Sequence, residues 1–112
     1  MDVDVFGRKN SVPEAIRAQA QVKVAKIGRL APVLERAEVR LVEDRDAPAA
    51  RRHLCEVTME GHGHVVRARA RASELQAAVD LVVEKLEHQV ERLKGKLLGR
   101  SHPRRSKLLS KA

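Results

Sequence analysis

The longest apolar periodicity in the chain covers residues 73–98 and predicts one long helix. Its apolar residues recur every three to four positions for about seven turns. They are Leu75, Val79, Val82, Val83, Leu86, Val90, Leu93 and Leu97. No proline or glycine interrupts this pattern before Gly95. The pattern predicts an amphipathic helix whose apolar stripe packs on the rest of a small domain.

Acidic and basic residues lie on opposite borders of that stripe, at the helical rotation of about 100° per residue. The acidic border holds Asp80, Glu84, Glu87 and Glu91. The basic border holds Lys85, His88, Arg92 and Lys96. A helix that needs only solubility usually mixes its signs, so the separation indicates a basic border that faces an anion. A solvated face with ordinary i,i+4 ion pairs is the alternative, and the helix alone leaves both open.

Length and composition indicate one small domain. The chain has 112 residues, of which 43% are hydrophobic. Its single cysteine, Cys55, excludes an internal disulfide and argues against a thiolate metal site. Residues 1–9 begin acidic and lack the apolar core of a signal peptide, and no apolar run approaches the length of a membrane span. We therefore expect a cytoplasmic protein.

Charge indicates a polyanionic partner. The net charge is +8, and residues 100–112 contain five arginines and lysines and no acid. We expect residues 1–98 to form the folded domain and residues 99–112 a basic, disordered tail or the start of a linker. The excess of basic over acidic residues indicates that this partner is nucleic acid. Phe6 is the only aromatic residue, so binding should use phosphates and RNA shape rather than base stacking.

The other periodic segments predict a strand over residues 2–6, a helix over 13–30, and strands over 38–42, 52–60 and 64–72. Each strand has one apolar face and each helix one apolar stripe. The fold class is therefore α+β, a two-layer β-α-β-β-β-α arrangement. We expect a four-stranded mixed sheet, with the first two strands parallel and both helices packed on one face.

A second basic border lies on the first predicted helix, where Lys23, Lys26 and Arg29 follow one another at i+3. Helices packed side by side would bring the two basic borders together. We expect them to line one groove or ridge with six main cations: Lys23, Lys26, Arg29, Lys85, Arg92 and Lys96. Ordinary surface cations are the alternative. On the strand over 64–72, Arg67, Arg69 and Arg71 share one face, for which we favour a solvated strand face, with an anion site as the alternative.

Catalysis has little support in the sequence. Cys55 lies on an inward strand face, as a small core residue would, and His53 precedes it near the strand start. His62 and His64 flank Gly63 in a predicted turn, without the further ligands of a metal site. No glycine-rich loop opens a helix to bind phosphate. We therefore expect no enzyme, no cofactor, no metal and no small-molecule substrate.

Three stretches match a known family in order and spacing. The clearest is the last predicted helix, against a pattern of an acidic residue, an apolar residue, Tyr, any residue, Ala-Ile-Asp or Asn, and then Lys-Leu-Glu-Arg-Gln-Leu. The matching residues are Glu74, Leu75, Ala78, Val79, Asp80, Lys85, Leu86, Glu87, Gln89 and Val90. The others are residues 13–29, PEAIRAQAQVKVAKIGR, and residues 55–74, CEVTMEGHGHVVRARARASE.

Through these stretches, residues 1–98 resemble the ribosome hibernation promoting factor family, also called ribosome-associated inhibitor or protein Y. The resemblance implies the same fold order and binding in the channel of the small ribosomal subunit that messenger and transfer RNA would occupy. Basic side chains of both helices would contact ribosomal RNA phosphates. That role would fall on Lys23, Lys26, Arg29, Lys85, Arg92 and Lys96, and on His88 in the place of a family arginine. The implied biology is translation inhibition in stress and stationary phase.

Two positions depart from the family pattern. Gln76 stands where the family usually has Tyr, and His88 where it has Arg, which weakens one phosphate contact. Long members carry a second domain that pairs ribosomes, and we expect pairing here only if such a domain follows. Two other functions remain open: a protein-interaction module that docks a basic partner on the acidic border, and a general binder of structured RNA.

Overall fold

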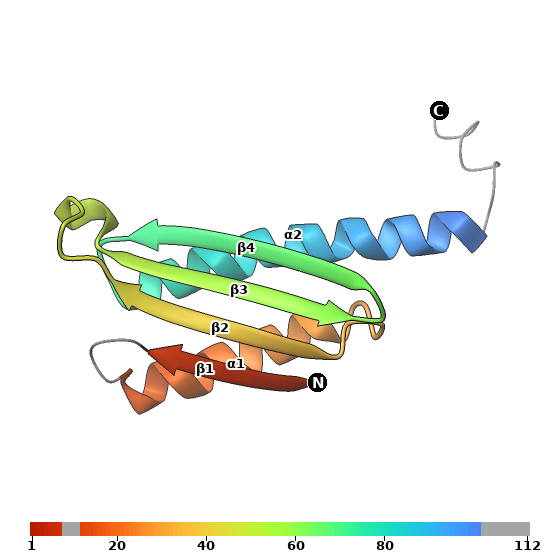
Figure 1. The fold of residues 1–112 in the computed structure, drawn as a ribbon, viewed down its shortest axis with the longest axis horizontal. Helices are drawn as coiled ribbons and strands as arrows, with labels where there is room; N and C mark the ends of the chain where they lie inside the picture. Colours follow the sequence, from red (N-terminus) through yellow and green to blue (C-terminus); the bar gives the residue numbers. More distant parts are fainter. Residues whose placement is uncertain (8–11, 102–112) are drawn as a thin grey trace.

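The computed structural model describes residues 1–7 and 12–101 of the chain. These residues form four strands, two helices and one short 3-10 turn, in the predicted order β-α-β-β-β-α (Figure 1). The elements are β1 (Asp2–Gly7), α1 (Glu14–Gly28), β2 (Arg36–Glu43), η1 (Ala49–Arg51), β3 (His53–Gly61), β4 (His64–Ala72) and α2 (Leu75–Ser101). The predicted fold class is confirmed.

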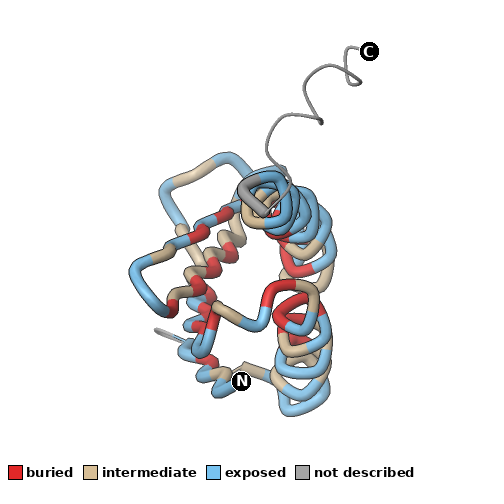
Figure 2. Tube along the Cα trace, turned by 90° about the vertical axis from the view of Figure 1, so that its right-hand side faces the viewer, coloured by how far each residue is buried: buried red, intermediate tan, exposed pale blue. Residues whose placement is uncertain are grey.

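The four strands form one sheet in the order β1-β2-β3-β4. β1 pairs with β2 in parallel, and the other pairs are antiparallel. Both helices cover the same face, α1 beside β1 and β2, and α2 beside β3 and β4 (Figures 1 and 2). The opposite face of the sheet is open to solvent. β1 and β4 are therefore the two edge strands.

The core lies between the sheet and the helices, where the buried positions of both layers face one another (Figure 2). Val57 and Met59 of β3 are fully buried, as is Leu86 of α2. β4 contributes Ala68 and Ala70 to this layer. These small side chains let α2 lie close to the sheet, and α2 packs mainly on β4 and β3.

A two-residue turn joins β3 to β4. His62 and Gly63 both have positive φ, at 48° and 81°, and Gly61 pairs with His64 across the turn. Two such residues suit the type I′ hairpin, whose twist matches that of the flanking strands. A Cβ on Gly61 would lie 2.2 Å from the Val33 carbonyl oxygen. Glycine therefore lets the segment before β2 pack closely against this end of β3.

Element ends differ from the prediction by a few residues. β2 covers Arg36–Glu43 because its first and last residues pair with Glu60 and His53 of β3. The first helix ends at Gly28, and the residues after it form turns, with Leu30 N donating to Ile27 O at 3.0 Å. Strand pairing and turn contacts determine where these elements end. The apolar periodicity within one segment carries no information about such contacts.

The long helix is confirmed and continues beyond its expected end. α2 covers Leu75–Ser101, so the start of the expected tail belongs to the helix. Its last turns extend beyond the ends of β3 and β4 at their connecting turn (Figure 1), and Leu98 in this part of the helix is exposed. Residues 102–112, the remainder of that expected tail, lie outside the described part of the chain. Neither α1 nor α2 is both long and apolar enough to cross a bilayer within residues 1–7 and 12–101.

Candidate nucleic-acid interface

The acidic border of α2 faces α1. Lys23 Nζ of α1 lies 3.2 Å from Asp80 Oδ1, which also accepts a hydrogen bond from Gln76 Nε2 at 3.1 Å. Further along the two helices is a hollow of about 340 Å³, lined by Lys23, Lys26, Ile27, Leu30, Val83 and Glu87. Cations of α1 therefore lie opposite the acids of α2 in this groove. The pairing reduces the positive charge that α1 offers to a partner.

The three predicted cations of α1 do not point to one place. Lys23 is partly buried against α2, while Lys26 is exposed at the groove. Arg29 follows the end of α1 and lines a different hollow, which contains Met1, Pro32 and Glu35 but no residue of α2. The i+3 spacing carries these side chains progressively around the helix, away from the groove.

The basic border of α2 faces the other way, toward β4 and solvent. Lys85 Nζ donates to the Arg69 carbonyl oxygen of β4 at 3.1 Å. Arg92 and Lys96 line a hollow of about 160 Å³ together with Val65 and Val66 of β4. His88, on the same border, is exposed. In the described part of the chain, none of these four cationic or imidazole side chains lies in an ion pair.

The expectation of one groove lined by six cations is therefore wrong. Lys23 and Lys26 lie between the helices, whereas Lys85, Arg92 and Lys96 lie on the far side of α2. The apolar stripe of each helix faces the sheet, and the side of α2 on which α1 packs then decides which border meets the neighbouring helix. Sequence periodicity reveals that one border is basic, but it does not reveal on which side the neighbour lies.

Strand β4 places three arginines near the basic border of α2, on a strand face that the sequence predicts to be solvated. Arg67, Arg69 and Arg71 alternate with buried residues and so lie on the outer face of the sheet. The alternation was visible in the sequence. The missing information was that β4 is an edge strand beside the basic border of α2.

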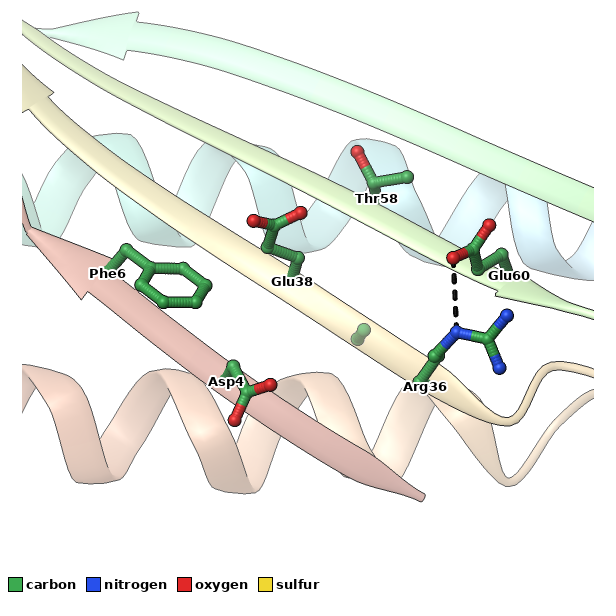
Figure 3. Close-up of a pocket in the computed structure, with 7 residues that line it drawn as sticks. Asp4, Phe6, Arg36, Glu38, Thr58 and Glu60 are labelled. Carbon is green, nitrogen blue, oxygen red and sulfur yellow. Dashed lines mark hydrogen bonds and ion pairs between the residues drawn. The ribbon is translucent and has the colours of Figure 1, made fainter.

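The opposite side of that outer face is acidic. A shallow hollow of about 280 Å³ crosses β1, β2 and β3, and its lining includes Asp4, Glu38 and Glu60 (Figure 3). Phe6, half exposed, also lines it, and Arg36 Nε forms an ion pair with Glu60 Oε2 at 3.1 Å (Figure 3). Carboxylates here would repel phosphate. The acidic surface therefore lies over β1 to β3, and the arginines of β4 lie beside it at one edge of the sheet.

The cysteine and histidines considered as catalytic or metal-binding residues lie in environments that do not favour either role. Burial, with a smaller contribution from neighbouring Glu56, raises the pKa of the Cys55 thiol from 9.0 to about 12. The thiol therefore stays protonated near neutral pH and is a poor nucleophile. His62 Nε2 lies 2.9 Å from Glu35 Oε2. Among residues 1–7 and 12–101, no three His, Cys, Asp or Glu side chains gather in a way that would hold a metal ion.

Comparison with known proteins gives one family and two informative structures. Residues 3–98 match the family described as sigma 54 modulation protein / S30EA ribosomal protein. The crystal structure of the Thermus thermophilus Protein Y N-terminal domain is 29% identical, with a TM-score of 0.67, over 83% of this chain and 99% of that one. A ribosomal subunit interface protein from Coxiella burnetii is 18% identical, with a TM-score of 0.72, over 85% and 99%, and shows the fold alone. No curated protein matches this chain in sequence.

Proposed function

The chain belongs to the family of sigma 54 modulation proteins and S30EA ribosomal proteins, and on that premise we propose that it is a ribosome hibernation factor. It binds ribosomal RNA in the decoding region of the small subunit. There it excludes messenger and transfer RNA and so inhibits translation, in the cytoplasm and without catalysing a reaction. On the same proposal, we expect the protein to be expressed in stress or stationary phase.

The free basic border of α2 is the observation that carries this proposal. Lys85, Arg92 and Lys96 are exposed, and no ion pair joins any of them to a described residue. The helix places them about 10 Å and 6 Å apart along its axis. Because the core fixes α2, little order has to be gained when phosphates bind. Cations without ion pairs on a rigid element suit a folded RNA backbone.

The lack of aromatic residues narrows the kind of RNA. Phe6 is the only aromatic side chain of the chain, and it lies on the acidic part of the outer sheet face. Proteins that hold single strands usually stack bases on aromatic rings. This surface instead suits phosphates of an RNA that is already folded, as in the small subunit.

Co-sedimentation with ribosomes tests the proposal. The protein is mixed with small subunits and pelleted through a cushion at two salt concentrations, with and without a messenger analogue. We expect it to pellet with the subunits, and the analogue to prevent this. Pelleting that the analogue leaves unchanged would place the protein elsewhere on the ribosome. Absence of pelleting at low salt would contradict ribosome binding.

The salt dependence of affinity tests the mechanism. If Lys85, Arg92 and Lys96 each contact one phosphate, counterion release predicts a slope of about −2 to −3 when log affinity is plotted against log salt. A slope near −1 would be incompatible with a surface of several cations. An unrelated RNA duplex is the control. Equal affinity for that duplex would support a general binder of structured RNA instead.

Docking of a basic partner on the acidic border of α2 is less well supported. Asp80 is already paired with Lys23, and Glu87 lines the same groove as Lys23 and Lys26. A basic partner would have to compete with these cations. Glu84 and Glu91 remain exposed, so charge reversal at these two positions separates the two functions.

A further inference from the structure

We propose that the RNA-binding surface continues from α2 across the edge of the sheet, where Arg67 and Arg69 of β4 bind phosphates of the same RNA. This inference rests on the proposed function and extends its site onto the outer face of the sheet. It gives a role to a row of arginines that neither the helices nor the core requires.

The two arginines are held on a rigid edge. β4 is the last strand of the sheet and covers His64–Ala72. Its inward residues are buried, which fixes Arg67 and Arg69 on the outer face, about 7 Å apart along the strand. Both are exposed, and Arg67 Nε donates to Thr58 Oγ1 of β3 at 3.2 Å. That neutral partner orients the guanidinium without cancelling its charge.

Arg71, the third arginine of the row, is placed differently. Its Nη1 lies 3.5 Å from Asp44 Oδ2 and donates to the Arg51 carbonyl oxygen at 3.2 Å. Its side chain is 27% exposed. These contacts tie Arg71 to the segment before β3 and compensate its charge. We therefore assign the phosphate contacts to Arg67 and Arg69 alone.

The β4 arginines and the basic border of α2 form one continuous surface. Lys85 Nζ bonds to the main chain of Arg69 itself, at 3.1 Å. Toward the start of β4, Arg92 and Lys96 share a hollow with Val65 and Val66. α2 therefore lies directly along the β4 edge, and an RNA backbone that contacts Lys85 is within reach of Arg69.

This surface is not neutralised from within. Among the described residues, no carboxylate lies within ion-pair distance of Arg67, Arg69, Lys85, Arg92 or Lys96. Glu56 is opposite Arg69 in the strand register, yet the two side chains form no ion pair. On β2, by contrast, Arg36 of the same sheet face is paired with Glu60. Adjacent like charges repel one another, and a polyanion removes that cost when it binds.

The test compares paired substitutions that remove equal charge from one face of the sheet. The variant R67Q/R69Q acts on the proposed surface, and R36Q/R40Q is its matched control on β2. R67K/R69K keeps the charge on β4. For each variant, affinity for purified small subunits is measured over a salt series, and thermal unfolding confirms that the protein is folded.

We expect R67Q/R69Q to bind about tenfold or more weakly, with a salt slope smaller in magnitude by about 1.4 to 1.8, as two lost phosphate contacts require. R67K/R69K should keep the wild-type slope, and R36Q/R40Q should change little. If R67Q/R69Q keeps the wild-type slope, or if R36Q/R40Q reduces it equally, the β4 surface is not a phosphate site, although ribosome binding would stand. If the wild-type protein does not bind subunits at low salt, both proposals fail.

Discussion

The two borders of α2 carry opposite charges and meet different surroundings. On the acidic border, Asp80 pairs with Lys23 of α1 and Glu87 shares a groove with α1 lysines. On the basic border, Lys85 reaches a neutral main-chain oxygen of β4, and Arg92 and Lys96 line a hollow without a carboxylate. On the acidic border, two of the four acids thus face cations of α1. On the basic border, no cation has a carboxylate partner among the described residues.

This difference separates a structural role of charge from a binding role. Exposed ion pairs are worth little, typically below about 1 kcal/mol, so pairing at the acidic border only modestly stabilises the packing of the helices. The cations on the basic border gain no ion pair from the described part of the fold, although Lys85 donates one hydrogen bond to β4. Their position is explained if their partner is a separate polyanion. The acidic border should then affect stability slightly, and the basic border should affect binding strongly.

Reversing charge on the basic border is expected to have the largest effect. K85E/R92E replaces by carboxylates two cations that the proposal places against phosphates, which would both remove contacts and add repulsion. We expect affinity for small subunits to fall by about 100-fold or more at moderate salt. Co-sedimentation or fluorescence anisotropy measures the change. Unfolding temperatures should stay close to wild type, because both side chains are exposed.

The matched control reverses charge on the other border of the same helix. E84K/E91K also changes two exposed residues of α2, and it should leave affinity unchanged or raise it slightly. If E84K/E91K abolished binding while K85E/R92E preserved it, the comparison would be inverted. The protein-interaction module would then become the better account of the chain.

A smaller effect is expected when charge is added to the basic border. His88 occupies the place where the family pattern has arginine, and its side chain is exposed between Lys85 and Arg92. H88R introduces a permanent charge and a bidentate donor, so affinity should rise by about tenfold or less. A50R, which adds an arginine in η1, is the control for net charge. Equal gains in both variants would show that affinity follows net charge rather than this border.

Most of the fold could be predicted because it depends on local periodicity. Alternation over residues 64–72 predicted both faces of β4, with Val66, Ala68 and Ala70 inward, and the stripe of α2 predicted its buried side. The family resemblance, based on three stretches in the right order, is confirmed. Strand ends were less accurate, since Arg36 and Glu43 belong to β2 through their partners on β3.

The sequence could predict which side chains of α2 share a surface, but not which neighbouring elements that surface meets. Lys85, Arg92 and Lys96 do share one exposed surface, as the helical spacing predicted. Which neighbour each border meets depends on the side of α2 on which α1 packs, and that is a tertiary property. For this reason the common groove with Lys23 was wrong, and the adjacency of Lys85 and Arg69 was missed. The RNA-binding role of these residues stays a prediction.

The smallest effect concerns the ion pair between the helices. Lys23 and Asp80 have side chains that are 38% and 52% exposed, so solvent screens their attraction. A double-mutant cycle with K23Q and D80N should give a coupling energy of about 0.2 to 1 kcal/mol in urea unfolding, smaller at high salt. D80N also releases Lys23 from its partner, and affinity for small subunits should rise by about twofold. Zero coupling would mean that the acids of α2 are as unpaired as its cations. Ion pairing within the protein would then not distinguish the two borders. Only the binding measurements could distinguish them.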